Sequence, residues 1–125
     1  MTSRRLRSER GSVSLVTAAL VLVTMVLALL SVDILQVVAA KDRAQLAADA
    51  AALAAAQELV LPSERTPTDL AAEYASRNGA TLVSCACDPG SSDAVVTVER
   101  TVRLSFLGGE RTVLGRARAT VEDGF

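Results

Sequence analysis

The sequence contains no histidine and no tryptophan, and it has a single tyrosine, Tyr74, and a single lysine, Lys41. Without an imidazole the chain offers neither histidine acid–base catalysis nor a histidine metal site. Aromatic residues make up 2% of the 125 residues although hydrophobic residues make up 50%, so alanine, valine and leucine replace the rings that fill most compact cores. We therefore expect no enzymatic activity, no catalytic residue, no cofactor and no bound metal.

Charge is distributed unevenly along the chain. The first twelve residues carry four arginines and one glutamate, a net +3, which leaves −4 for the remainder of a chain whose formal net charge is −1. Residues 11–32 then contain no charge at all. At 1.5 Å per residue, a helix over residues 13–32 spans about 30 Å, the thickness of a bilayer's hydrocarbon core. The pattern predicts a basic cytoplasmic leader, 1–12, followed by a transmembrane helix, 13–32.

The two charges that flank the apolar stretch define the expected membrane boundaries. A charged side chain at the bilayer centre costs about 2.5 to 3.5 kcal/mol, so we expect Arg10 at the cytoplasmic interface and Asp33 at the outer one. A cleaved secretory signal ending near residues 38–40 is the alternative, but its apolar region would exceed the usual ~7–15 residues. We predict a retained single-pass helix that leaves residues 33–125 outside the cytoplasmic membrane.

The helical pattern continues beyond the apolar stretch. Residues 33–59 contain neither glycine nor proline, and 11 of the 18 residues in 39–56 are alanine, the strongest helix former. These features predict an Ala-rich helical rod over residues 33–61, continuous with the membrane helix from about Ser12 to Leu59. Alanines at spacings of three and four form one face that packs either on the chain's own C-terminal part or on a neighbouring protein: Ala44, Ala47, Ala48, Ala51, Ala54 and Ala55.

A short helix opens the C-terminal part, residues 62–125, which we expect to form a small extracytoplasmic head. Thr66 suits the N-cap, Pro67 the first helical position, and Gly79 the position after the helix end.

From Ala80 onward, apolar and polar residues alternate and indicate β-structure. Three strands are expected over residues 81–87, 94–107 and 113–121. Gly108 and Gly109 suit a two-residue hairpin turn, and Arg100 interrupts an apolar strand face, which predicts a bulge there. The fold class is therefore α+β: a long N-terminal transmembrane helix extending into the rod, a short helix, and a three-stranded antiparallel meander.

Cys85 and Cys87 are the only thiols. Side chains two apart on a strand stand parallel, so a bond between them requires backbone distortion, and two cysteines supply only half of a tetrahedral zinc site. Packed thiols and a local or intermolecular disulfide both remain open. The arginines near the strands do not indicate nucleic acid, because the outer part is net acidic and almost free of aromatic residues for stacking.

Residues 9–58 resemble the N-terminal region of the TadE/TadG-like proteins of tight-adherence (Flp-type) pilus assembly. The shared features are basic residues before Gly11, a long apolar helix, Asp33 at its outer end, and the run ADAAALA at 48–54. The resemblance implies a non-enzymatic, pilin-like structural or assembly component of a Flp-type pilus or secretion-like system. It also implies a single-pass protein of the bacterial cytoplasmic membrane, with the membrane and other pilin-like, pilus-assembly or secretion proteins as partners.

The resemblance further implies processing by a prepilin peptidase between Gly11 and Ser12. Pilin precursors generally carry glutamate five residues into the mature chain, where this sequence has Val16. A function from another class is a membrane-tethered extracytoplasmic binding module with no pilus role, which would recognise its ligand through the arginine and threonine face of the sheet. A mature start at Ser12 favours assembly, whereas autonomous folding and binding by residues 60–125 favours a binding module.

Overall fold

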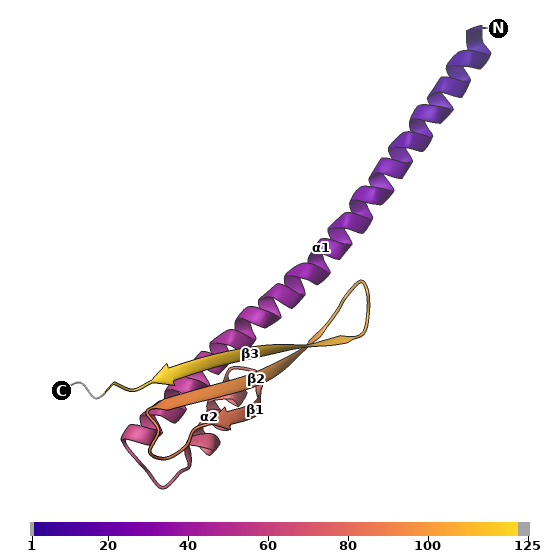
Figure 1. Ribbon diagram of the computed structural model, residues 1–125. Coiled ribbons are helices and arrows are strands. Elements are labelled where there is room, and N and C mark those ends of the chain that lie inside the picture. Colours follow the sequence, from indigo (N-terminus) through magenta and orange to yellow (C-terminus); the bar gives the residue numbers. More distant parts are fainter. Residues whose placement is uncertain (1, 123–125) are drawn as a thin grey trace.

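The computed structural model describes residues 2–122, with side chains from Arg10 onward. It confirms the expected α+β arrangement of a long N-terminal helix, a short helix and a three-stranded antiparallel sheet with strand order β1-β2-β3 (Figure 1). The elements are α1 (Thr2–Val60), α2 (Pro67–Arg77), β1 (Thr81–Ala86), β2 (Asp93–Arg103) and β3 (Glu110–Thr120).

Helix α1 is longer than the sequence analysis predicts. It begins at Thr2 instead of near Ser12, and it ends at Val60. Gly11 does not interrupt it, since one glycine costs only about 1 kcal/mol relative to alanine in a helix interior. No proline precedes Pro62, so no residue forces an earlier break. The leader backbone is therefore helical, whereas the side chains of its first three arginines, at positions 4, 5 and 7, lie outside the described residues.

The sheet and α2 pack along the second half of α1, and the first half projects away from them (Figure 1). Alanines supply most of the buried side chains on the α1 side, so the backbones of helix and sheet approach closely. Gly115 of β3 lies at such a close approach. A Cβ atom built there would lie 2.8 Å from the backbone nitrogen of Gln45 and closer still to the carbonyl of Ala44. Only glycine fits this contact without displacing a backbone.

Helix α2 has the ends that its sequence predicts. The Oγ1 atom of Thr66 accepts a hydrogen bond from the backbone N–H of Asp69 at 3.1 Å, and Pro67 occupies the first turn. Gly79 follows the helix with a φ of +76°, in the left-handed region that favours glycine. Between these ends, Ala71 and Ala75 are fully buried against the rest of the core.

The predicted two-residue hairpin turn is wrong. Strand β2 ends at Arg103, which pairs with Glu110, and residues 104–109 form a longer loop closed by a 3.1 Å hydrogen bond from Leu104 N–H to the Gly109 carbonyl. Both Gly108 and Gly109 have positive φ, as a tight reversal requires. The loop is longer because its amide groups bind a side chain of α1, as described below, instead of continuing the ladder.

The predicted bulge at Arg100 is also wrong. The pairing of β2 with β3 runs without interruption from Asp93 to Arg103, and the irregularity lies in β1, between Leu82 and Ser84. Arg100 fits the regular strand because its long side chain reaches past the sheet and donates a 2.9 Å hydrogen bond to the carbonyl of Gly79. The arginine therefore ties β2 to the end of α2.

Candidate functional site

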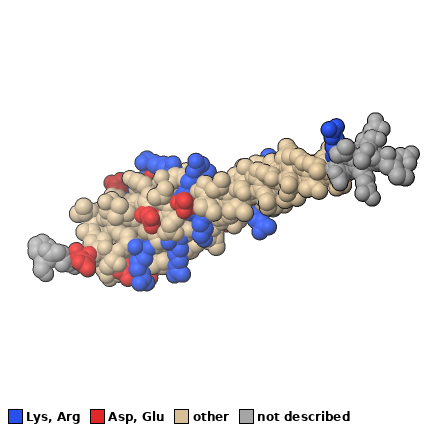
Figure 2. All heavy atoms as spheres, turned by 90° about the horizontal axis from the view of Figure 1, so that it is seen from above, with Lys and Arg blue, Asp and Glu red and all other residues tan. Residues whose placement is uncertain are grey.

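The N-terminal half of α1 exposes a continuous apolar surface. It is the one helix in the described part of the chain that is long and apolar enough to cross a membrane, and none of its most apolar stretch is buried. Between Arg10 and the head, the space-filling view shows a stretch of helix without charged residues (Figure 2). The exposed large side chains of this stretch are Val13, Leu15, Val16, Leu20, Val21, Leu22, Val23, Met25, Val26, Leu27, Leu29 and Val32.

Three of the four polar side chains at 13–32 are satisfied inside the helix. Thr17, Thr24 and Ser31 each donate a 2.8 Å hydrogen bond to the carbonyl oxygen four residues earlier. Such bonds remove most of the cost of placing a hydroxyl in lipid, because the donor no longer needs water. The helix surface is thus chemically suited to a hydrocarbon environment along its whole apolar length.

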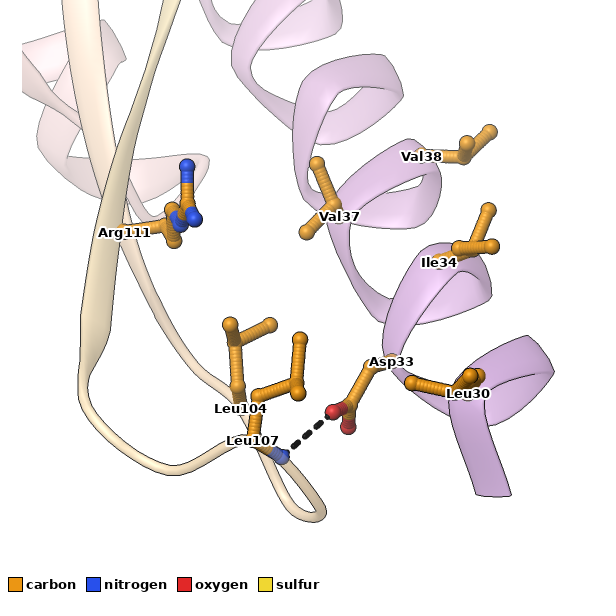
Figure 3. A pocket seen from close by; sticks show the side chains of 8 residues that line it. All are labelled: Leu30, Asp33, Ile34, Val37, Val38, Leu104, Leu107 and Arg111. Atoms are coloured by element: carbon orange, nitrogen blue, oxygen red, sulfur yellow. Dashed lines mark hydrogen bonds between the residues drawn. The ribbon is translucent and has the colours of Figure 1, made fainter. Parts of the chain in front are cut away.

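Asp33, which we expect at the outer membrane boundary, binds the loop between β2 and β3. Its carboxylate accepts hydrogen bonds from the backbone N–H groups of Ser105 at 3.0 Å, Phe106 at 3.0 Å and Leu107 at 2.7 Å. The side chain points from α1 toward the loop (Figure 3), and only 3% of the residue is exposed. One carboxylate therefore satisfies three successive amides that the shortened strand leaves without partners.

These amides also set the charge state of the carboxylate. The N–H of Phe106 has the largest effect and lowers the pKa of Asp33 from its ordinary value of 3.8; burial opposes this, and the N–H groups of Leu107 and Ser105 lower the pKa further. Asp33 is therefore ionised at neutral pH.

Gln36, one turn further along α1, strengthens the same attachment. Its Nε2 atom donates to the hydroxyl of Ser105 at 2.8 Å, and its Oε1 atom accepts from the Ser105 N–H at 3.3 Å. Gln45 repeats this arrangement at the middle of β3, where it bonds both the N–H and the carbonyl of Arg116. Neither glutamine contact is visible in the sequence, since neither the spacing nor the residue type of an isolated glutamine indicates a partner about 70 positions away.

An apolar groove of about 400 Å³ lies between α1 and the loop, beside Asp33 (Figure 3). Its walls come from the outer end of the apolar stretch, from the turn of α1 that follows Asp33, and from the loop itself. The lining residues are Leu30, Asp33, Ile34, Val37, Val38, Leu104, Leu107 and Arg111. Arg111 and Asp33 are the only charged residues among them.

The six alanines of the expected packing face are all buried, with exposed fractions of 7% or less. Five belong to one core cluster with residues of α2 and β2, whereas Ala54 is buried outside that cluster. The opposing members on α2 and β2 are Ala71, Ala75, Ala94, Val96 and Val98. In this structure the face packs on the chain's own head, which is one of the two alternatives that the sequence leaves open.

The remaining singled-out residues lie apart from the groove. Cys85 and Cys87 are joined by a disulfide with a Cα–Cα distance of 5.4 Å. Cys87 lies just beyond the end of β1, so the two side chains are not held parallel by a continuous strand. Gly11 and Ser12 are exposed within α1, and no neighbouring atom lies within 4 Å of a Cβ built at Gly11. Among the described residues, no group of three or more acidic or cysteine side chains could hold a metal ion.

An exposed apolar helix continued by a small helix-and-sheet head defines the class of protein: one with a candidate N-terminal membrane anchor and a compact head attached directly to it. Residues 11–58 match the model of the family described as "Putative Flp pilus-assembly TadE/G-like". The resemblance given by the N-terminal sequence is thus confirmed over that segment, and the rest of the chain lies outside the match. No curated protein and no solved structure matches the chain.

Proposed function

We propose that this protein is a non-enzymatic, pilin-like assembly component of a Flp-type pilus or a related secretion system. The observation that carries this proposal is where the family match falls. Residues 11–58 include the whole exposed apolar stretch and nearly all of the Ala-rich rod, and they end two residues before α1 does. The matched segment is therefore one structural unit, a helix that can lie in lipid at one end and supports the head at the other.

The proposed topology is a single pass through the bacterial cytoplasmic membrane, with residues 13–32 in the bilayer. Arg10 and the arginines that precede it keep the N-terminus in the cytoplasm by the positive-inside rule, which places the head outside. The Cys85–Cys87 disulfide supports this orientation, because disulfides persist in oxidising compartments outside the cytoplasm.

Lateral contacts with other pilin-like or assembly proteins are the proposed mode of action. Within the membrane, the whole exposed surface of the apolar stretch is free to pack against neighbouring helices. Outside it, Leu46, Leu53 and Val60 are exposed at seven-residue intervals on the side of α1 that the head leaves uncovered. Apolar residues at this spacing form a line along one helix face and suit a second helix.

Processing by a prepilin peptidase between Gly11 and Ser12 belongs to the same proposal. Both residues are exposed, and Gly11 is the only glycine in α1. Mass spectrometry of the protein purified from its native membrane tests this step directly. A mature chain that begins at Ser12 supports it, whereas an intact leader on the protein recovered with a pilus shows that cleavage is not needed.

Anchoring and orientation are tested with paired variants. Leu22→Arg combined with Val26→Arg adds about 5 to 7 kcal/mol to a helix whose insertion preference is roughly −4 to −7 kcal/mol, so the variant should leave the membrane fraction. Leu53→Arg combined with Leu61→Arg makes the same chemical change at exposed positions outside the span, and the protein should stay in the membrane. Protease added to spheroplasts should digest the head of the wild-type protein. Equal fractionation of both variants, or a protected head, contradicts the proposal.

A membrane-tethered binding module is the second candidate, and the outer face of the sheet favours it. That face is uncovered and carries Thr101, Arg103, Thr112, Arg116, Arg118 and Thr120 together with Asp93, Glu99 and Glu110. Arg103 pairs with Glu110 and Arg118 with Asp93, whereas Arg116 belongs to no ion pair among the described residues. Arg116 and the threonine hydroxyls suit hydrogen bonds to an anionic or hydroxyl-bearing wall polymer. Binding of the full chain to isolated wall material, lost on Arg116→Ala with Arg118→Ala but retained on Leu61→Ala, would favour this function over assembly. The fragment 60–125 is unsuitable for the test, because the alanines of α1 form one side of the head's core.

A further inference from the structure

We propose that the loop of residues 104–109 rests in the outer headgroup layer of the same membrane that α1 spans. Lipid chains then fill the groove beside Asp33, and neighbouring arginines contact lipid phosphates. This inference rests on the proposed anchoring of α1. The occupant is the phospholipid surface, and the geometry points to it through depth, exposed apolar side chains and charge.

The depth of the loop follows from its contacts with α1. Ser105, Phe106 and Leu107 all bond Asp33, the first residue after the predicted span. Leu104 and Leu107 line the groove together with Leu30. The loop is therefore level with the outer end of the apolar stretch, and the ribbon view shows it reaching past the strands along α1 toward the N-terminal end of the helix (Figure 1). If residues 13–32 span the bilayer, the tip of the loop lies level with the outer end of the span.

The side chains at this tip are apolar and exposed. Phe106 is 43% exposed and Leu107 is 62% exposed, although the backbone N–H groups of both residues are fixed by Asp33. The carboxylate thus holds the backbone inward and presents two large apolar side chains to the surroundings. In water this arrangement is unfavourable, whereas in the headgroup region it contributes to membrane attachment, as the apolar faces of interfacial helices do.

Charge at this end of the head complements an anionic surface. Among the side chains of α1, β2 and β3 that surround the loop and the adjoining part of the helix, five are basic and three are acidic: Lys41, Arg43, Arg100, Arg103 and Arg111 against Asp33, Asp42 and Glu110. Asp33 is buried against the loop amides, and Glu110 pairs with Arg103. In Figure 2 the charged groups nearest the uncharged stretch of α1 are basic. Each basic residue close to an anionic leaflet is worth about 1 kcal/mol of attraction.

Arg111 is the arginine placed best for a lipid phosphate. It lines the groove, it is exposed, and no ion pair in the described part of the chain involves it. Apart from Asp33, which is turned toward the loop amides, the groove wall on α1 is apolar: Leu30, Ile34, Val37 and Val38. A phosphate at Arg111 therefore leaves the acyl chain of the same lipid beside an apolar surface.

Single-tryptophan variants test the position of the loop, because the natural sequence contains no tryptophan. The full chain carrying Phe106→Trp is reconstituted into vesicles of phosphatidylcholine and phosphatidylglycerol, with and without bromine on the acyl chains near the headgroup. Leu61→Trp is the matched control, an exposed apolar position at the far end of α1. We expect emission at shorter wavelength and several-fold stronger quenching by brominated lipid for Phe106→Trp than for Leu61→Trp.

The outcomes separate this inference from the anchoring on which it rests. If the protein floats with the vesicles but Phe106→Trp matches Leu61→Trp in wavelength and quenching, the loop does not touch lipid and the inference is overturned. If the protein does not float with the vesicles, the anchoring proposal fails first. Added to the Phe106→Trp chain, Arg111→Ala should weaken the rise of quenching with phosphatidylglycerol content, whereas Arg118→Ala, at the other end of β3, should not. Equal effects of the two substitutions would remove Arg111 from the lipid contact.

Discussion

Replacing Gly115 with alanine adds one methyl group at the contact between β3 and α1. The new Cβ atom would meet the Ala44 carbonyl and the Gln45 nitrogen, and both belong to the backbone of a continuous helix. Neither can rotate away as a side chain could. The helix and the sheet must therefore move apart, which loosens the alanine core on both sides of Gly115.

Two effects of opposite sign determine the size of the loss. Gly115 does not have a positive φ, so alanine is compatible with its backbone and would by itself gain about 0.4 to 1 kcal/mol from a less flexible unfolded chain. Overpacking a tight contact costs typically 1 to 3 kcal/mol. The middle of the two ranges leaves a net loss, and we expect the head to lose about 1.3 kcal/mol of its free energy of unfolding, within limits of about 0 to 2.6 kcal/mol.

Hydrogen exchange of the β2 and β3 amides, measured on the full chain in detergent micelles, reports this loss as a lower free energy of opening. Leu114→Ala is the control on the adjacent residue, because its side chain is half exposed, and we expect a change within about 0.5 kcal/mol. Gly11→Ala is the control for the substitution itself, since it meets open space. Unchanged protection in Gly115→Ala would refute the close approach of β3 to α1.

Three further outcomes are expected. The pKa of the Asp33 carboxylate is lowered below 3.8 in the folded protein, so the carboxylate should stabilise the loop above that pH and release it as the pH falls through the lowered pKa. Faster hydrogen exchange of the Ser105 and Leu107 amides in acid would show this release. In Asp33→Asn the pH dependence should disappear. Thr66→Ala removes the acceptor for the Asp69 N–H and should destabilise α2 by about 1 kcal/mol, measured by exchange of its first-turn amides, with Ser92→Ala, at an exposed position outside the helix, as the comparison. Iodoacetamide should label neither cysteine before reduction and both afterwards, as read from the intact mass; labelling without a reductant would contradict the Cys85–Cys87 bond.

Local signals in the sequence are sufficient for both ends of α2 and for the C-terminal end of α1. The apolar stretch and the absence of proline predict α1 to within one residue at its C-terminal end, and Thr66, Pro67 and Gly79 predict both ends of α2. These signals act within one turn of the residues that they control, so a single sequence contains them completely. The earlier start of α1 was missed because nothing in the leader marks a preferred first residue.

Contacts between distant residues account for what the sequence could not supply. The alternation of apolar and polar residues alone extends β2 to Leu107. In the structure the strand ends at Arg103, because the amides that follow bond the Asp33 carboxylate instead of β3, and Asp33 lies 72 positions before Ser105. Asp33 was singled out for its charge at the boundary, and its role as an acceptor for the loop was not visible. Similarly, Gly115 reads as an ordinary strand residue until α1 is placed against it.

Because α1 passes from the apolar stretch into the head without a break, the head has no independent orientation. Sharp kinks need proline, paired glycines or an inserted group, and residues 12–60 contain neither proline nor glycine. The axis from Val32 to Val60 is about 42 Å long, so a typical tilt of about 20° shifts its far end sideways by roughly 14 Å. A small change in the tilt of α1, imposed by neighbouring helices inside the bilayer, therefore moves the head sideways by many ångströms. The position of the head thus depends on how the membrane-spanning segment is packed.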